Sequence, residues 1–253
     1  MRKMRPVKNK TYDDIASEWD EFAQIRSRQI VEGIDLSYHN VLIPCIFNLA
    51  SKSDLSNVLD MGCGAGYLTY KLSKKAKKVI GVDLSRDNIS IAQQNYGSNK
   101  KIDFIHSSIE DYADIAEKPE FSLAIANMTL MDVIKLDDVL SSVSKLLKKE
   151  GQFIFTITHP CFWPFYWKYA DEEWFEYTKE IIIEAMFSIS LQDTSEHLTT
   201  HVHRPLEMYF NSIERNGLKI DRIIEPLPTD EIANKYPKKW EYPRFLAVRC
   251  KKV

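Results

Sequence analysis

Residues 58–67 read Val58-Leu59-Asp60-Met61-Gly62-Cys63-Gly64-Ala65-Gly66-Tyr67, and this stretch decides the expected fold. A short apolar run ends in an acid, three glycines follow at alternate positions, and residues 68–72 read as the start of a helix. Strand, glycine turn and helix is the layout of a nucleotide-binding βα unit. The glycines let the backbone adopt conformations closed to other residues and let a ligand approach the main chain closely.

Two carboxylates flank this turn and restrict the ligand that it can hold. Asp60 lies two residues before Gly62, where a carboxylate repels a pyrophosphate but suits a positive ammonium or sulfonium group. Asp83 ends the apolar run 79–83, about 20 residues after Gly62, which is roughly where such units carry their ribose-binding acid. A ribose at Asp83 and a cationic, phosphate-free group near Asp60 describe S-adenosylmethionine and not NAD.

The two segments, Asp60–Gly66 and Gly81–Ser85, resemble motifs I and II of class I S-adenosylmethionine-dependent methyltransferases, of the bacterial small-molecule type (methyltransferase domain 11/25-like). The resemblance implies a Rossmann-like, doubly wound α/β fold. Its seven-stranded sheet is mostly parallel, with one antiparallel strand near the C-terminus. It also implies S-adenosyl-L-methionine as cofactor and S-adenosyl-L-homocysteine as product. A flavin or nicotinamide Rossmann unit, or a degenerate fold that binds nothing, is the alternative interpretation of the glycines.

Strand and helix patterns alternate along the middle of the chain. Expected strands cover 57–61, 79–83, 102–106, 121–126 and 152–158, and expected helices cover 66–76, 86–96 and 136–148. Such alternation predicts a parallel sheet with helices on both faces, whose ligands bind beyond the carboxyl ends of the strands. The polar residues at or just past these ends are Asp60, Asp83, Ser108, Asn127 and His159.

We expect a single domain in four segments. They are N-terminal helices or a lid over 1–50, a cofactor-binding core over 51–159, a substrate-cap insert over 160–203, and a closing helix and hairpin over 204–253. The helix over 11–24 starts at a plausible N-cap, Thr11, and a second helix covers 36–50. The helix 205–216 and the strands 218–225 and 244–250 match the closing helix and antiparallel hairpin of the resembling family.

The insert is longer than a plain crossover needs, and nine aromatic residues lie between 162 and 177. Its second half holds two alternating runs, 184–191 and 198–203, that could pair as a hairpin. We hypothesise that the insert forms a roof over a flat or apolar acceptor, with Phe162, Trp163 and Trp167 as substrate-binding candidates. A local hydrophobic cluster or a dimer interface is the alternative.

Methyl transfer chiefly requires that the acceptor is held at attack distance, and a protonated nucleophile also needs a base. Histidine titrates near neutral pH, and three of the six histidines surround the insert. His159, His201 and His203 are therefore candidates for the base or for positioning the acceptor. Arg204 could anchor an acidic acceptor or bind a neighbouring carboxylate, and Tyr209 follows in a segment that resembles those of bacterial small-molecule methyltransferases.

The resemblance implies that the residues binding the cofactor come from many places in the first half of the chain. The N-terminal helix resembles a lid that closes over cofactor and substrate in such enzymes, although simple packing is the alternative for it. Ser108 and Ile109 stand where many members carry an Asp-Ala pair near the adenine amine, and Ser108 can still accept a hydrogen bond. The expected cofactor-binding residues are Tyr12, Trp19, Asp60, Gly62, Cys63, Gly64, Gly66, Asp83, Leu84, Ser108, Ile109 and Asn127.

Composition limits the classes of partner that this chain is expected to bind. The length of 253 residues suits one α/β domain, and a net charge of −2 argues against broad nucleic-acid binding. Four cysteines without a C-x-x-C pair indicate reduced thiols and no metal site, and no apolar run approaches the roughly 20 residues that cross a bilayer. We expect a cytoplasmic monomer or homodimer without nucleic-acid or membrane partners.

The function expected from the sequence is methylation of O, N or C on a small, aromatic or apolar metabolite. An RNA or protein methyltransferase is the first alternative, although residues 127–132 lack the Asn/Asp-Pro-Pro-Tyr motif that is typical of enzymes methylating bases or glutamine. A non-catalytic S-adenosylmethionine-binding protein and a nucleotide-dependent oxidoreductase are the further alternatives.

Overall fold

A seven-stranded sheet forms the centre of the computed structural model, which describes residues 4–117, 119–192 and 196–253. The strand order is β4-β3-β2-β5-β6-β10-β9. Neighbouring strands from β4 to β6 pair in parallel, and β10 runs antiparallel to both of its neighbours. The strands are β2 (Asn57–Met61), β3 (Lys78–Asp83), β4 (Ile102–His106), β5 (Phe121–Asn127), β6 (Leu147–Thr158), β9 (Leu218–Ile224) and β10 (Phe245–Lys252). The predicted fold class is confirmed.

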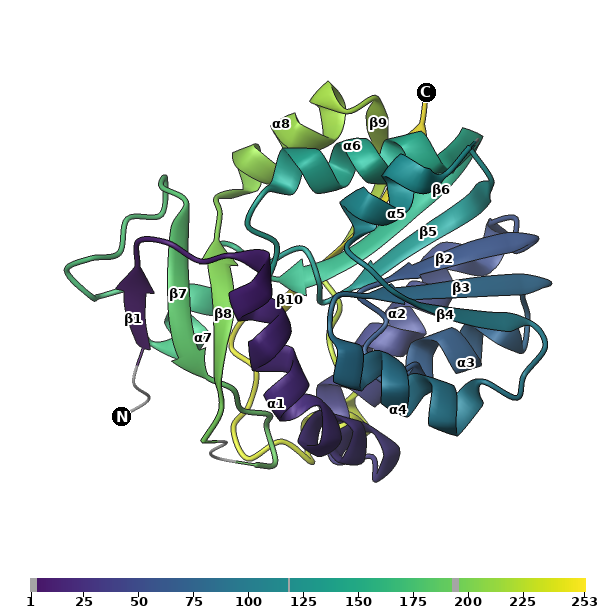
Figure 1. Cartoon of the computed structure of the whole chain (residues 1–253). Helices are drawn as coiled ribbons and strands as arrows, with labels where there is room; N and C mark the ends of the chain where they lie inside the picture. The colour runs from purple at the N-terminus through teal and green to yellow at the C-terminus, as the bar shows by residue number, and fades with distance from the viewer. Residues whose placement is uncertain (1–3, 118, 193–195) are drawn as a thin grey trace.

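Helices cover both faces of this sheet (Figure 1). One face carries α2 (Ile43–Leu49), α3 (Tyr67–Ser73) and α4 (Arg86–Tyr96), and the other carries α5 (Ile109–Ile115), α6 (Leu136–Leu146) and α8 (Leu206–Arg215). Successive side chains of a strand point to opposite faces. Accordingly Val58 of β2 packs in the cluster with α2 and α3, whereas Leu59 and Met61 pack in the cluster with α5, α6 and α8.

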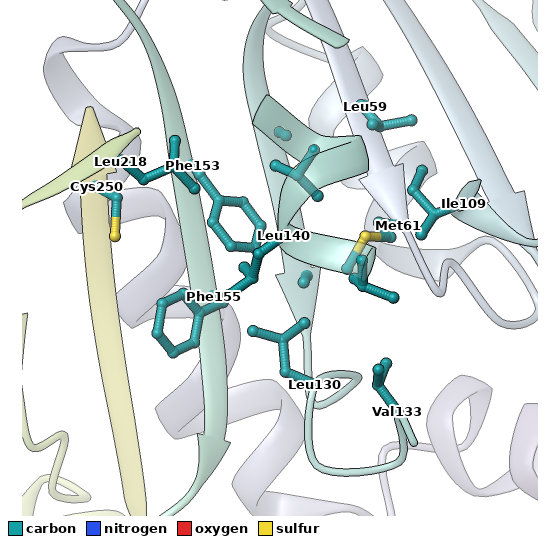
Figure 2. Packing of buried hydrophobic residues seen from close by; sticks show 14 of the residues in the cluster. Leu59, Met61, Ile109, Leu130, Val133, Leu140, Phe153, Phe155, Leu218 and Cys250 are labelled. Carbon is teal, nitrogen blue, oxygen red and sulfur yellow. The ribbon is translucent and has the colours of Figure 1, made fainter. Parts of the chain in front are cut away.

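The larger cluster holds the sheet against α6. Figure 2 shows the rings of Phe153 and Phe155 on β6 lying beside Leu140 of α6, and none of these three side chains is exposed. Burial on both faces explains why the central strands are almost continuously apolar in sequence.

A second, three-stranded sheet lies beside the large one, and Figure 1 shows α1 (Tyr12–Val31) between the two. It joins β1 (Met4–Val7) to a hairpin of β7 (Ile181–Met186) and β8 (Leu198–His203). The pairing of β7 with β8 agrees with the predicted hairpin in the second half of the insert, but its first strand covers 181–186 rather than 184–191. The participation of β1 was not predicted.

Local chemistry sets the length and attachment of α1. Thr11 accepts a hydrogen bond from the Asp14 N–H while the Asp14 carboxylate accepts one from the Thr11 N–H, which is a capping box. The helix extends to Val31, beyond the predicted range 11–24. Lys10 binds Glu18 of α1 at 2.6 Å and Glu184 of β7 at 2.7 Å, so that the helix is tied to the small sheet.

Other differences from the expected elements are local. The predicted helix over 36–50 contains a π-helical turn (Tyr38–Leu42) before α2, at the point where Pro44 lacks the N–H that an α-helix needs. The chain after β4 forms α5, which was not among the expected helices, and the insert also forms α7 (Trp163–Trp167). A short α9 (Asp230–Ala233) precedes β10.

The four predicted segments include residues 1–3, 118 and 193–195, which lie outside the described residues. Within the described part of the chain, no helix is long and apolar enough to cross a membrane.

Replacing Phe155 by alanine tests the core. Phe155 is fully buried in the middle of β6, so Phe155→Ala removes a large side chain and leaves a cavity. We expect the free energy of unfolding, measured with urea, to fall by about 3–5 kcal/mol. Ile223→Ala, at a side chain that is 46% exposed on β9, should cost well under half of that and serves as the control.

Candidate active site

A cavity of about 300 Å³ opens at the carboxyl ends of β2, β3 and β5. Its wall combines three parts of the chain: the glycine turn and strand ends, the N-terminal helix α1, and the insert with the segment that leads into β10. Segments that are far apart in the sequence therefore contribute to one enclosed space.

The glycine turn forms the floor of this cavity. Gly62, Gly64 and Gly66 all have positive φ angles of 65°, 53° and 81°, where side chains with a Cβ are strained. A Cβ on Gly62 would lie 2.5 Å from the side chain of Thr129, and one on Gly66 would lie 2.7 Å from the ring of Phe104. At Gly64 nothing lies within 4 Å of such an atom, so the backbone there is open to a ligand.

Asp83 is fixed beside the turn by the backbone. One carboxylate oxygen accepts a hydrogen bond from the Gly64 N–H at 2.7 Å, and the other accepts one from the Ser85 N–H at 2.9 Å. Burial raises the pKa of this carboxyl, and the two backbone hydrogen bonds oppose that shift. The carboxylate lines the cavity with lone pairs still free for further donors.

Asp60 is the more deeply buried acid, at 1% exposure, and it also lines the cavity. Thr69 Oγ1 donates to its carboxylate at 2.6 Å. Burial is the main reason why the pKa of Asp60 is raised to about 7; the nearby Asp83 contributes to this rise, and the hydrogen bond from Thr69 opposes it. Among the described residues, no lysine or arginine pairs with Asp60.

The N-terminal helix closes one side of the cavity. Tyr12 and Trp19 both line it, as a lid role requires. The Tyr12 hydroxyl donates to Glu110 at 2.7 Å, and burial raises the pKa of Tyr12. Trp19 contacts Phe187 of the insert edge-on, with ring centroids 6.0 Å apart.

The expected cofactor-binding residues gather at this floor and side. All twelve except Gly66 line the cavity, and Gly66 acts as the N-cap of α3 instead. The Ser108 hydroxyl is used as the N-cap of α5, where it accepts from the Asp111 N–H at 3.0 Å. Asn127 accepts a hydrogen bond from Thr156 at 2.7 Å. Their contacts with a cofactor stay predictions.

The aromatic insert forms the opposite wall. Trp163 and Trp167 of α7 line the cavity with Tyr166, and the centroids of the two tryptophans are 5.1 Å apart. Phe162 does not line it, because its ring stacks on Tyr242 at 5.5 Å on the outer side.

The three candidate histidines occupy different environments. His201 lines the cavity, and burial lowers its pKa to about 3, with His203 and Arg204 adding to the shift. His203 lies outside the cavity wall and donates to the Tyr177 carbonyl at 3.0 Å. His159 also lies outside the wall, where it pairs with Glu225 at 2.8 Å. The structure therefore brings one of the three to the cavity.

Arg204 does not line the cavity but organises the loop beneath it. Its side chain is completely buried, pairs with Glu180, and donates to the carbonyls of Val133 at 2.6 Å and Ile134 at 2.9 Å. Of its two predicted roles, the observed contacts match the binding of a neighbouring carboxylate. Tyr209 lies against Arg204 in the core and outside the cavity wall.

Residues that sequence reasoning missed complete the wall. Asp132 follows β5 and lines the cavity, and burial raises its pKa well above the usual range, with Glu18 adding to the shift. Its place after a strand end was the available signal. Arg26, Tyr38 and Arg244 also line the cavity, but nothing in their sequence neighbourhoods distinguishes them.

Comparison with known proteins agrees with this arrangement. The model of a methyltransferase domain matches residues 52–204, which is more than half of the chain. A ubiquinone biosynthesis O-methyltransferase of Vibrio atlanticus (strain LGP32) is 26% identical over 154 residues, covering 60% of this chain and 61% of that protein. The protein with the same name in Pelagibacter ubique (strain HTCC1062) is 33% identical over 153 residues, covering 58% and 62%. The chain thus spans about 60% of the length of these curated relatives.

Solved structures share the fold. An S-adenosylmethionine-dependent methyltransferase from Clostridium acetobutylicum superimposes with a TM-score of 0.61 at 19% identity, covering 92% of this chain and 98% of that one. The 1,6-didemethyltoxoflavin-N1-methyltransferase of Burkholderia thailandensis, solved with 1,6-didemethyltoxoflavin and S-adenosylhomocysteine bound, has a TM-score of 0.60 at 13% identity, covering 100% of this chain and 96% of that one. Together with the domain match, these observations show that the chain belongs to the methyltransferase domain family.

Proposed function

We propose that this chain is an S-adenosyl-L-methionine-dependent methyltransferase that methylates O, N or C of a small, aromatic or apolar metabolite and releases S-adenosyl-L-homocysteine. One observation carries the proposal. A single cavity is lined by the glycine turn, by the carboxylates of Asp60 and Asp83, and by aromatic residues of the insert.

The residues of the floor fit the cofactor. The open space at Gly64 allows a ligand to approach the backbone, and Asp83 can accept hydrogen bonds from ribose hydroxyls while Gly64 and Ser85 hold it in place. Asp60 offers a buried carboxylate that a cationic group would stabilise in its ionised form. When bound, S-adenosylmethionine supplies a methyl group on a positively charged sulfur.

The wall contributed by the insert suits the acceptor. Trp163, Tyr166 and Trp167 provide flat apolar surface, and a cavity of this kind encloses most of a small ligand. In methyl transfer, the acceptor atom attacks the methyl carbon from the side opposite the sulfur. The protein must chiefly hold the acceptor in this line. A cavity of about 300 Å³ with an aromatic wall favours a small molecule over RNA or a protein, and the net charge of −2 also disfavours RNA.

Asp132 is a better candidate for the base than His201. A catalytic base works best when its pKa lies near the operating pH. Burial lowers the pKa of His201 to about 3, which makes its ring a weak base. Asp132 also lines the cavity, and burial raises the pKa of its carboxyl, which makes its carboxylate a stronger base than usual. We therefore assign proton removal from the O–H or N–H of the acceptor to the Asp132 carboxylate, and hydrogen bonding to the neutral ring of His201.

Arg204 lies outside the cavity and would support proton removal by positioning Asp132. Its hydrogen bonds to the carbonyls of Leu130, Val133 and Ile134 hold the loop that carries Asp132. Because this loop is fixed, the distance between the Asp132 carboxylate and the bound acceptor stays constant.

Binding and turnover test the proposed function directly. We expect calorimetry to show binding of S-adenosylhomocysteine and none of NAD, because Asp60 disfavours a pyrophosphate. With labelled S-adenosylmethionine, methyl transfer should appear on members of a panel of phenols and aromatic amines, and not on bulk RNA or protein. A protein that fails to bind S-adenosylhomocysteine would refute the proposal, and binding without any transfer would favour a non-catalytic binding protein.

The affinity for S-adenosylhomocysteine should depend on pH through Asp60. The pKa of Asp60 is about 7 without ligand, and the ammonium group of the ligand favours the ionised carboxylate, so binding lowers that pKa. The affinity for S-adenosylhomocysteine should therefore reach its maximum above pH 7, and it should fall by up to about tenfold for each pH unit below pH 7. Calorimetry between about pH 5.5 and 8.5 measures the slope. In Asp60→Asn the affinity should be lower at pH 8.5 and the slope should be flatter, and an equal slope in both proteins would exclude Asp60 as its source.

Replacing the two candidate bases separates their roles. We expect Asp132→Asn to lower kcat by about 10²–10⁴, with the affinity for S-adenosylhomocysteine unchanged. The variant should also remove the acidic limb from the pH profile of kcat measured at saturating S-adenosylmethionine, where the effect of Asp60 on cofactor affinity does not contribute. His201→Gln retains a hydrogen-bonding side chain and should lower kcat by less than about tenfold. A larger loss in His201→Gln than in Asp132→Asn would reverse the assignment.

A further inference from the structure

Arg244 is a buried cation in the cavity wall. It stands directly before β10, only 5% of it is exposed, and it lines the cavity together with Tyr166 and Ser190 of the insert. Its neighbours therefore belong to the part of the wall that we assign to the acceptor.

The partners of Arg244 are all uncharged. Nη1 donates to the Tyr166 hydroxyl at 3.0 Å and to Ser190 at 3.4 Å, and Nη2 donates to the Lys238 carbonyl at 3.4 Å. The guanidinium lies 3.9 Å from the centre of the Tyr166 ring and 4.5 Å from that of Trp240. Among the residues that the structure describes, no carboxylate pairs with it.

Two other arginines near the cavity, Arg26 and Arg204, each pair with a carboxylate. Arg26 pairs with Asp35 at 2.7 Å, and Arg204 pairs with Glu180. Burial of a charge without an opposite charge is costly, and for Arg244 burial lowers the pKa while only the two tyrosines Tyr166 and Tyr236 oppose the shift. An arginine nevertheless stays protonated in proteins. The cavity therefore holds a positive charge that a bound anion would neutralise.

We propose that Arg244 binds a carboxylate of the acceptor, so that the substrate is a small aromatic acid. This inference rests on the methyltransferase function proposed above and adds the substrate class. A guanidinium has five N–H donors, and the observed contacts use three of them on neutral oxygens. The remaining donors can hold a carboxylate, and the contacts with Tyr166 and Trp240 hold the plane of the guanidinium.

The charge in the wall favours a carboxylate over a phosphate group. Arg26 and Arg244 are the cationic residues in the lining formed by the described chain, and Arg26 already has Asp35. One unpaired arginine balances one negative charge, whereas a phosphate monoester carries close to two at neutral pH.

Ring contacts link Arg244 to the candidate catalytic residues. Tyr166 lies 5.1 Å from Trp163, Trp163 lies 5.1 Å from Trp167, and Trp167 lies 6.0 Å from His201. An acceptor ring beneath these tryptophans would have its carboxylate at Arg244 and its nucleophilic atom toward His201. Arg244 would thus position the acceptor.

Matched pairs of an acid and its amide test this inference. We would titrate benzoate and benzamide, phenylacetate and phenylacetamide, and 3-phenylpropionate and its amide into the protein saturated with S-adenosylhomocysteine. At least one acid should bind the wild-type protein about tenfold or more tightly than its amide, as a charge-assisted hydrogen bond does. In Arg244→Gln the preference should disappear while the affinity for S-adenosylhomocysteine is retained.

Two further variants serve as controls. Arg249→Gln removes an arginine of β10 that pairs with Asp221 and does not line the cavity, so the preference should persist. Arg244→Lys keeps the charge but loses the planar fork, and it should weaken binding of the acid without changing that of the amide. Arg244→Lys also tests the role of Arg244 if Arg244→Gln does not fold. If Arg244→Lys and the wild-type protein bind the acid with equal affinity, the inference is contradicted.

The outcomes distinguish the two proposals. If the wild-type protein binds S-adenosylhomocysteine but prefers no acid of the three pairs, the role of Arg244 is refuted and the methyltransferase function stands. If the protein does not bind S-adenosylhomocysteine, the methyltransferase function is refuted, and the inference on Arg244 that rests on it is refuted as well. A preference that persists in Arg244→Gln would also refute the role of Arg244.

Discussion

The structure around the cavity depends on two neighbouring carboxylates at the glycine turn, the buried Asp60 and the partly exposed Asp83. Asp83 is held by two backbone N–H groups, and Asp60 is held by one hydroxyl. Burial opposes ionisation of both, and the described chain supplies neither with a lysine or an arginine. Such a pair reduces stability in the free protein, and a ligand that brings hydroxyl donors and a positive charge removes the penalty.

The fold places the two halves of the cavity through a small number of buried contacts. β2 and β3 bring the carboxylates together at neighbouring strand ends, while Arg204 ties the segment after β5 to the start of α8. The Val202 N–H also donates to the Met131 carbonyl at 2.6 Å, so the insert and the loop that carries Asp132 are joined directly. Displacement of the insert would therefore move Asp132 as well.

Sequence patterns predicted the parts of this arrangement that are local. The strand ending at Asp60, the positive-φ glycines and the acid at Asp83 are encoded within about 25 residues, and burial on both faces gives the strands their apolar runs. The pairing of β1 with β7 joins residues 4–7 to residues 182–185, and no local periodicity records such a contact. Arg204 was ambiguous for the same reason, since its partners are backbone carbonyls that any sequence would provide. Asp132 had one sequence signal, its place after β5, whereas Arg244 is recognisable only from the cavity that it lines.

The separation of opposite charges within one cavity is itself an argument about function. If Arg244 lay against Asp60 or Asp132, the two would form an internal ion pair and neither would attract a ligand. Tyr166, Trp163 and Trp167 belong to the same wall as Arg244, and the acids belong to the strand ends and the loop after β5. A folding sequence selected for stability alone would pair or remove these groups, because each unpaired buried charge costs free energy. Their presence in separate parts of one cavity wall fits two ligands of opposite charge, with the cation bound at the glycine turn and the anion bound at Arg244.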